Sequence, residues 1–286
     1  MKKLTIICIS LFLGSCLITS CDKSASTDKG QSTETKAKAK KKSDKKVFIY
    51  TAQHRKDKYQ PTEPVISFSK KLGSANEAEF EGNEYIEEVY FNDQFKHIMN
   101  RAFANCKNLR EVHFAAPIPV INDEAFIGCT SLKNLICDAY TVGLSSFEGC
   151  TSLENVRFGD HMYWIRENSF AGCTNLKSIL MGITLEKLDE GAFTGSNAVE
   201  EFSVPQAMKN RMFGYFAECP NVKRVYILST EYFPVPKNCT PKADCTIYVP
   251  DAFLKQFQGD AEWSKFGKIE PLSQTKYFTP EGFWKK

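Results

Sequence analysis

The sequence contains none of the short motifs that mark common catalytic centres. There is no G-x-S-x-G, H-E-x-x-H, G-x-x-x-x-G-K or G-x-G-x-x-G pattern, although a catalytic triad assembles in space and needs no local motif. Histidine is also scarce, and none of the four has a metal-like or triad-like spacing: they are His54, His97, His113 and His161. We therefore predict no catalytic residues, no metal site, no cofactor and no enzymatic activity.

A strongly basic folded region is lacking as well. The whole chain has a formal net charge of +3, to which residues 1–20 contribute +2 and residues 22–46 contribute +5. Residues 47–286 are therefore mildly acidic, with a net charge of −4. A nucleic-acid-binding protein needs a basic face for the phosphates, so we predict no nucleic-acid partner.

No apolar run near the N-terminus is long enough to span a bilayer as a helix, which needs about 20 residues. The run Leu4–Leu13 follows two lysines and is typical of a secretory signal peptide. The sequence Ile18-Thr19-Ser20-Cys21 resembles a bacterial lipobox, in which the cysteine is acylated. We predict a lipoprotein signal peptide over residues 1–20 and lipidation of Cys21, which polar residues follow. Cys16 is an alternative site, and an ordinary secretory signal is a third reading.

Residues 22–46 contain no aromatic and no branched aliphatic side chain. Such a segment cannot bury enough apolar surface to offset the entropy lost on ordering, so residues 21–46 are predicted to be a lipidated cysteine and a disordered tether. The tether is either a solvated spacer or a further contact with anionic lipid head groups. This arrangement predicts a bacterial cell-envelope protein, anchored by lipid in the outer membrane or at the cell surface and facing outward or into the periplasm.

What the sequence does contain is a repeat. Octets such as AFIGCTSL, SFEGCTSL and SFAGCTNL each place a phenylalanine three residues before a cysteine. Successive phenylalanines are 23, 21, 23, 23 and 23 residues apart: Phe103, Phe126, Phe147, Phe170, Phe193 and Phe216. An apolar triplet begins at the last residue of each octet, as in Leu153, Val156 and Phe158. Self-similarity at a period of 20–50 residues is typical of a solenoid, a propeller or another repeat array.

This pattern predicts a β-rich (α+β) solenoid whose turns each supply one strand to a parallel sheet. One turn buries about six apolar side chains, a gross gain of roughly 10–15 kcal/mol. Ordering its residues costs about 1–2 kcal/mol each in backbone entropy. A single unit is therefore unstable alone, and the units must stack. We expect about seven 23-residue rungs over residues 84–230, with the phenylalanines inside.

The A-F-x-G-C-x-x-L-x-x-V pattern resembles the BspA-like leucine-rich repeats of bacterial surface proteins. The resemblance covers residues 84–230 and depends on six octets in register. It implies protein ligands, a role in adhesion to host or neighbouring cells, and no catalytic residues.

Both ends of the array are predicted to be capped, which keeps the terminal rungs soluble. Residues 231–286 are predicted to form the C-terminal capping unit. Within it, residues 245–272 are similar to the terminal unit that such proteins carry, with Ile247 and Val249 in a last strand and a short helix over residues 251–257. Residues 47–83 lack the period and are expected to form the N-terminal cap. Within this cap, residues 47–51 and 64–69 are predicted to be strands.

The repeated cysteines are predicted to be packing residues. Metal sites use short spacings such as C-x-x-C, whereas a 23-residue spacing stacks each thiol on the next at ~4.8 Å. Parallel side chains suit a disulfide poorly, so we interpret these cysteines as small buried hydrophobic residues. Cys239 and Cys245 differ because they flank a loop, and they are either joined by a disulfide or separate.

The outward-facing positions of the predicted strands form a candidate ligand-binding face. Apolar and aromatic side chains with arginine are typical of a protein interface when they are exposed. Either these side chains bind a partner, or a flanking segment folds over them. The candidate ligand-binding residues are Tyr90, His113, Ile136, Arg157, Leu180 and Tyr226.

Together these features predict a non-catalytic binding lipoprotein of the cell envelope that acts in protein–protein interaction or adhesion through its strand face. The alternative is a glycan-binding accessory surface lipoprotein, in which exposed tyrosine and tryptophan rings stack on sugars. The segment Met162-Tyr163-Trp164 is either a binding tip or part of the outer packing.

Overall fold

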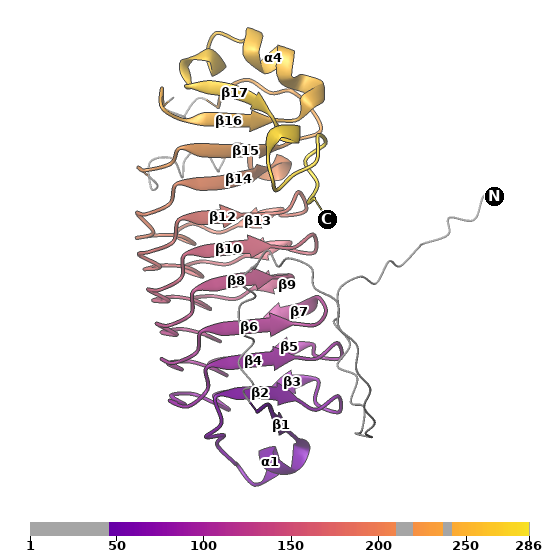
Figure 1. Cartoon of the computed structure of the whole chain (residues 1–286), viewed down its shortest axis with the longest axis vertical. Helices are drawn as coiled ribbons and strands as arrows, with labels where there is room; N and C mark the ends of the chain where they lie inside the picture. The colour runs from indigo at the N-terminus through magenta and orange to yellow at the C-terminus, as the bar shows by residue number, and fades with distance from the viewer. Residues whose placement is uncertain (1–45, 210–219, 237–241, 286) are drawn as a thin grey trace, which may run out of the picture. The chain divides into compact units, whose positions relative to one another are not determined.

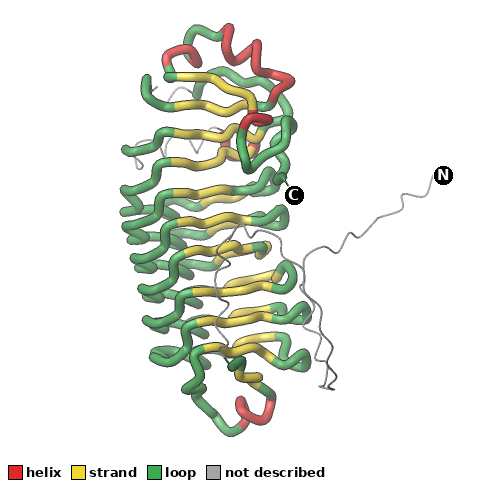
Figure 2. Tube along the Cα trace, viewed as in Figure 1, coloured by secondary structure: helices red, strands yellow, loops and turns green. Residues whose placement is uncertain are grey.

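The computed structural model describes residues 46–209, 220–236 and 242–285. The unit Asp44–Lys286 is an elongated stack of parallel strands (Figures 1 and 2), which confirms the predicted solenoid. The predicted signal peptide, Cys21 and the tether up to residue 45 lie outside the described residues, as do Phe216, Cys219 and Cys239.

One face of the solenoid is built from strands that pair in parallel with the equivalent strand of the next turn. It consists of a four-stranded sheet, β1-β2-β4-β6, and a seven-stranded sheet that runs from β8 to β17. We call it the strand face. Its strands are β1 (Phe48–Tyr50), β2 (Val65–Phe68), β4 (Glu88–Phe91), β6 (Glu111–Phe114), β8 (Asn134–Cys137), β10 (Asn155–Phe158), β12 (Ser178–Leu180), β14 (Glu201–Pro205), β15 (Arg224–Leu228), β16 (Thr246–Val249) and β17 (Lys268–Pro271).

A second parallel sheet, which the sequence did not predict, runs along the opposite side of the core. Each of its short strands contributes a buried side chain from the last apolar position of the repeat, such as Ile121 or Ile165. The two four-residue strands each bury a second side chain, Ile118 and Ala139. The strands are β3 (Ser74–Ala75), β5 (His97–Ile98), β7 (Ile118–Ile121), β9 (Ala139–Val142), β11 (Trp164–Ile165) and β13 (Lys187–Leu188).

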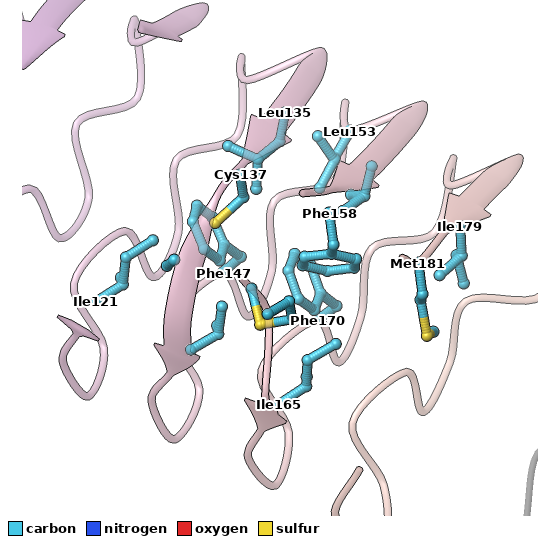
Figure 3. Close-up of a cluster of buried hydrophobic side chains, with 14 of the residues drawn as sticks. Ile121, Leu135, Cys137, Phe147, Leu153, Phe158, Ile165, Phe170, Ile179 and Met181 are labelled. Atoms are coloured by element: carbon cyan, nitrogen blue, oxygen red, sulfur yellow. The ribbon is translucent and has the colours of Figure 1, made fainter. Parts of the chain in front are cut away.

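The repeated phenylalanines form a stacked column in the core, part of which is visible in Figure 3. From Phe103 to Phe193, neighbouring ring centroids are 5.1–5.3 Å apart, and the rings are within 12° of parallel. The rings are fully or almost fully buried. The 23-residue step therefore places identical rings in contact, as the repeat predicts.

The repeated cysteines are buried beside this column, and each thiol also donates a hydrogen bond. Sγ of Cys129 lies 3.2 Å from the carbonyl oxygen of Phe103, and Sγ of Cys150 lies 3.4 Å from that of Phe126. Ser196 replaces cysteine in one turn, and its Oγ makes the equivalent bond at 3.3 Å. The position therefore requires a small side chain that can donate to the preceding turn.

The ladder of repeats begins one rung before residue 84. Phe80 is fully buried and stacks on Phe103, with a centroid distance of 4.9 Å, while β2 pairs in register with β4. The two strands expected within residues 47–83 are present as β1 and β2, but the second of them belongs to a complete turn. The solenoid therefore has about eight turns, and α1 (Ala52–Lys56) lies at its N-terminal end.

At the C-terminal end, the expected strand is present as β16, but it is not the last one. A 3₁₀ turn (Asp251–Phe253) and α4 (Leu254–Gly259) follow it, close to the predicted helix. The 3₁₀ turn Trp263–Lys265 then leads to β17, which pairs in parallel with β16. After β17, the chain turns back along the strand face as residues 272–285, which we call the C-terminal segment (Figure 1).

Candidate ligand-binding face

The strand face has an open half and a covered half. The open half consists of the outward residues of β4, β6 and β8, of which Tyr90 is 37% exposed and Ile136 is 67% exposed. The covered half consists of the outward residues of β10 to β16, of which Leu180 is 4% exposed and Tyr226 is 3% exposed. Of the two alternatives that the sequence left open, a flanking segment that folds over the face is the one observed at Leu180 and Tyr226, so these two candidate residues are not available to a ligand.

The C-terminal segment causes this difference. Phe278 and Leu272 are fully buried and pack in one apolar cluster with Leu180 and Tyr226. These outward residues therefore belong to a small second core beneath the segment.

The same segment also shields Arg157, the third candidate residue that lies on the covered half. The ring of Trp284 lies 3.9 Å from its guanidinium carbon, within the range of a cation–π contact. Trp284 also stacks on Phe278, with a centroid distance of 4.6 Å. Burial lowers the pKa of Arg157 from its ordinary value. Of the six candidate residues, Tyr90, His113 and Ile136 remain on an open surface.

A buried carboxylate fastens the C-terminal segment to the covered half. Oε1 of Glu201 accepts hydrogen bonds from Oγ of Ser178 at 2.8 Å and from the hydroxyl of Tyr277 at 3.0 Å. Oε2 accepts from Nε of Arg224 at 2.9 Å and from the hydroxyl of Tyr226 at 2.8 Å. Burial alone opposes the charge of Glu201, but these four donors hold its pKa below its ordinary value.

The open half contains an interruption of the strand face. Strands β6 and β8 do not pair with each other in the described structure, and at their start Lys133 N donates to Arg110 O at a long 3.4 Å. The interruption coincides with the 21-residue turn, in which only Asp138 separates β8 from β9. In the sequence, the signal for this interruption was the short 21-residue step between Phe126 and Phe147.

A hollow of about 590 Å³ lies at this interruption. Its rim contains two cations, Arg110 and Lys133, and the exposed apolar side chain of Ile136. The facing edges of β6 and β8 also border it, and these two edges are not paired with each other. We call it the β6–β8 hollow. Its lining residues are Arg110, Glu111, Val112, His113, Phe114, Lys133, Asn134 and Ile136.

The described thiols of the repeat are poor nucleophiles. Burial raises the pKa of the Cys106, Cys137 and Cys173 thiols to about 12, and it raises those of Cys129 and Cys150 well above their ordinary value. A reactive cysteine needs an exposed, low-pKa thiolate, which these residues do not offer. Cys245 is buried, and a disulfide with Cys239 stays one of two alternatives because Cys239 lies outside the described residues.

A second aromatic surface lies on the outer side of the second sheet. Tyr140 on β9 is 52% exposed and stacks on Tyr163, with a centroid distance of 4.9 Å and an interplanar angle of 5°. Met162 is fully buried, so this part of the Met162–Trp164 segment belongs to the packing. Trp164 is half-buried, and Nζ of Lys187 lies 5.1 Å from its ring centroid.

Stacked turns with one parallel strand each, inward ladders of apolar side chains and a strand-lined face define a leucine-rich repeat solenoid. The BspA type leucine rich repeat pattern matches residues 64–140 and 138–234 of the chain, in six copies. The chain therefore belongs to this family of bacterial surface-associated repeat proteins, whose scaffolds are typically non-catalytic. No curated protein matches the sequence significantly.

Several solved bacterial structures resemble the chain. A leucine-rich repeat protein from Bacteroides ovatus has 19% sequence identity and a TM-score of 0.35; the match covers 57% of this chain and 55% of that protein. The T. pallidum leucine rich repeat protein has 15% identity and a TM-score of 0.39, over 71% of this chain and 78% of that one. The pneumococcal vaccine antigen PcpA has 12% identity and a TM-score of 0.35, over 74% and 80% respectively.

Within the described residues, no helix has the length and apolar character needed to cross a membrane.

Proposed function

We propose that this chain is a lipid-anchored protein of the bacterial cell envelope that binds a protein partner through the open half of its strand face, in an adhesive role. The observation that carries the proposal is the exposed Ile136 beside the β6–β8 hollow. A large apolar side chain with two thirds of its surface in water is costly to leave uncovered. Flanking arginine, lysine and aromatic groups supply the contacts that dominate protein interfaces.

The strand edges at the hollow favour an extended segment of a partner protein. Strand edges offer backbone donors and acceptors that a partner backbone can satisfy. The cations Arg110 and Lys133 on its rim favour an acidic side chain beside the apolar group that contacts Ile136. A partner with alternating acidic and apolar side chains suits both features.

Site-specific photo-cross-linking in intact cells tests this proposal. A photoreactive phenylalanine at position 136 is expected to trap a discrete protein partner. The matched control places the same residue at Tyr85, which is 58% exposed and does not line the hollow. The further change Lys133→Glu is expected to weaken the adduct at position 136. Equal adducts at both positions, or none at position 136, would contradict the proposal.

The envelope anchor is tested separately. Replacing Cys21 by alanine is expected to abolish metabolic labelling with a fatty acid, since Cys21 is the predicted acylated residue. Replacing Cys16 by alanine is the matched control and is expected to leave labelling intact. The opposite pattern would move the anchor to Cys16, and labelling that survives both changes would remove the lipid from the proposal.

Glycan binding is the second candidate function, and the Tyr140–Tyr163 pair favours it. Two parallel, partly exposed rings form a flat apolar surface against which a sugar ring can pack. A glycan array probed with the purified chain tests this candidate. Binding that disappears in Tyr140→Ala but persists in Ile136→Ser would favour the glycan function over the protein partner.

A further inference from the structure

Three side chains on the open half form a compact set of metal-ligand groups, and two of them, Glu111 and His113, also line the β6–β8 hollow. Glu88 on β4 and Glu111 on β6 are register partners on adjacent parallel strands. His113 follows Glu111 by two residues on β6, so all three side chains stand on the same face of the sheet. One ligand atom from each lies within 4.8 Å of the other two.

The spacing of these atoms suits a first-row divalent cation. A zinc ion bound at about 2.0–2.2 Å holds its ligand atoms roughly 3–4 Å apart. Nε2 of His113 and Oε2 of Glu111 are already 3.1 Å apart, and the carboxylate of Glu88 is within reach of both. The three groups therefore need only small side-chain movements to converge on one ion.

Two features of this set favour a bound cation. Glu88 and Glu111 lie directly opposite each other on neighbouring strands. Like charges in this arrangement repel each other. Nε2 of His113 is shielded from solvent, and among the described residues it makes no hydrogen bond of acceptable geometry. A cation between the carboxylates removes the repulsion and gives Nε2 a partner.

Tyr90 orients two of the three ligands. Its ring stacks on the imidazole of His113, with a centroid distance of 4.3 Å and an interplanar angle of 11°. Its hydroxyl donates a hydrogen bond to Oε2 of Glu88 at 3.2 Å. Outer contacts of this kind hold metal ligands in their binding orientation.

We propose that Glu88, Glu111 and His113 bind a zinc ion on the open half of the strand face. One imidazole with two carboxylates suits zinc, whereas calcium and magnesium prefer oxygen ligands alone. Three protein ligands leave a fourth position for water or for a donor from another molecule. This site depends on neither the protein partner nor the lipid anchor.

Calorimetric titration of the purified full chain with zinc chloride tests the proposal. We expect one equivalent of zinc to bind, without competition from excess magnesium or calcium. His113→Ala and Glu111→Gln are expected to abolish this binding. Tyr90→Phe, which removes only the hydroxyl that orients Glu88, is expected to weaken it by about 10-fold.

The matched control is His161→Ala, because Nδ1 of His161 lies 2.9 Å from Oδ2 of Asp138 on another part of the surface. This variant is expected to bind zinc as the unchanged chain does. Circular dichroism of each variant checks that the solenoid is intact. X-ray absorption at the zinc edge is expected to show nitrogen and oxygen ligands.

Absence of zinc binding by the unchanged chain would overturn the proposal. Binding that survives both His113→Ala and Glu111→Gln, or a zinc ion with sulfur ligands, would overturn it too. Loss of the cross-link at position 136 with intact zinc binding would instead contradict only the protein-partner function.

Discussion

The open and covered halves of the strand face are built from the same repeat, yet only one of them is accessible. In the described residues, the stacked phenylalanine column from Phe103 to Phe193 runs inside both halves. They differ in what lies outside the sheet, since the C-terminal segment buries Leu180 and Tyr226 and leaves Ile136 exposed. The repeat thus determines the core, whereas residues beyond the repeat determine which outward side chains meet solvent.

The outward residues of the two halves suit these different environments. The covered half presents leucine and tyrosine around the carboxylate of Glu201, which accepts hydrogen bonds from the C-terminal segment and from the sheet. The open half presents charged groups around a single exposed isoleucine. The covered half is thus an intramolecular interface, whereas the open half is the surface that we propose for a partner protein.

The largest expected effect comes from the core that both halves share. Phe147→Ala removes a fully buried ring and leaves a cavity, so we expect it to lower the free energy of unfolding by about 3–5 kcal/mol. Urea denaturation measures this loss. A change below about 1 kcal/mol would show that the stacked column does not stabilise the solenoid.

The next largest effect is confined to the covered half. Phe278→Ala is expected to cost about 3 kcal/mol, because the ring is fully buried between the C-terminal segment and the sheet. Hydrogen exchange is expected to rise in β12 to β15 and to stay unchanged in β4 and β6. An equal increase in both halves would mean that the segment stabilises the whole array.

A smaller loss is expected when the buried carboxylate is changed. Glu201→Gln weakens the hydrogen bonds from Arg224, Tyr226, Ser178 and Tyr277, at a cost of about 1–3 kcal/mol. Because the folded pKa of Glu201 is lowered, its contribution is complete above the unfolded value of about 4.3. It is lost as the pH falls through the lower folded pKa.

Acid titration of the unchanged chain and of Glu201→Gln tests whether the stabilising contribution of Glu201 is lost as the pH falls. The unchanged chain is expected to lose more stability than the variant as the pH falls below about 4.3. Parallel loss in both proteins would show that Glu201 does not hold the segment in place.

The cysteine position is expected to be less sensitive still. Cys150→Ser keeps a donor for the carbonyl of Phe126, as Ser196 does for Phe170, whereas Cys150→Ala loses it. The hydrogen bond is worth about 0.5–1.5 kcal/mol, so the serine variant is expected to be the more stable of the two by urea denaturation. The reverse order would show that apolar volume alone matters at this position.

The smallest effect on stability is expected in the open half. Ile136→Ser removes an exposed side chain, and we expect its free energy of unfolding to change by no more than about 0.5 kcal/mol. A large loss in thermal denaturation would show that Ile136 is part of the packing and is unavailable to a partner.

The sequence predicted the interior well because the repeat encodes it locally. The spacing of Phe126, Phe147 and Phe170 specified both the stacking and the parallel strands. The rung at Phe80 was missed because Glu79 and Asn83 replace the usual alanine and cysteine of the octet. The second sheet was missed because most of its strands are too short to show an alternating pattern: β3, β5, β11 and β13 span two residues each and bury one side chain each.

The covered half could not be derived from the repeat, because its cover comes from residues distant in the sequence. The C-terminal segment contains Tyr277, Phe278, Phe283 and Trp284, and this aromatic content was a usable signal for a segment that packs on apolar outward residues. Where it packs depends on contacts such as Tyr277 with Glu201, 76 residues apart. The hollow likewise depends on how one short turn changes the pairing of its neighbours.

Thiol labelling of the native protein tests the difference between the two halves most directly. The native thiols at Cys106, Cys129, Cys137, Cys150 and Cys173 are buried with raised pKa values, so they contribute little to the labelling rate. Above the background of the unchanged chain, Ile136→Cys is expected to react with a maleimide at the rate of a freely exposed thiol. Leu180→Cys is expected to react only when the protein is unfolded. Equal rates for the two positions in the native protein would contradict the division of the strand face into an open and a covered half.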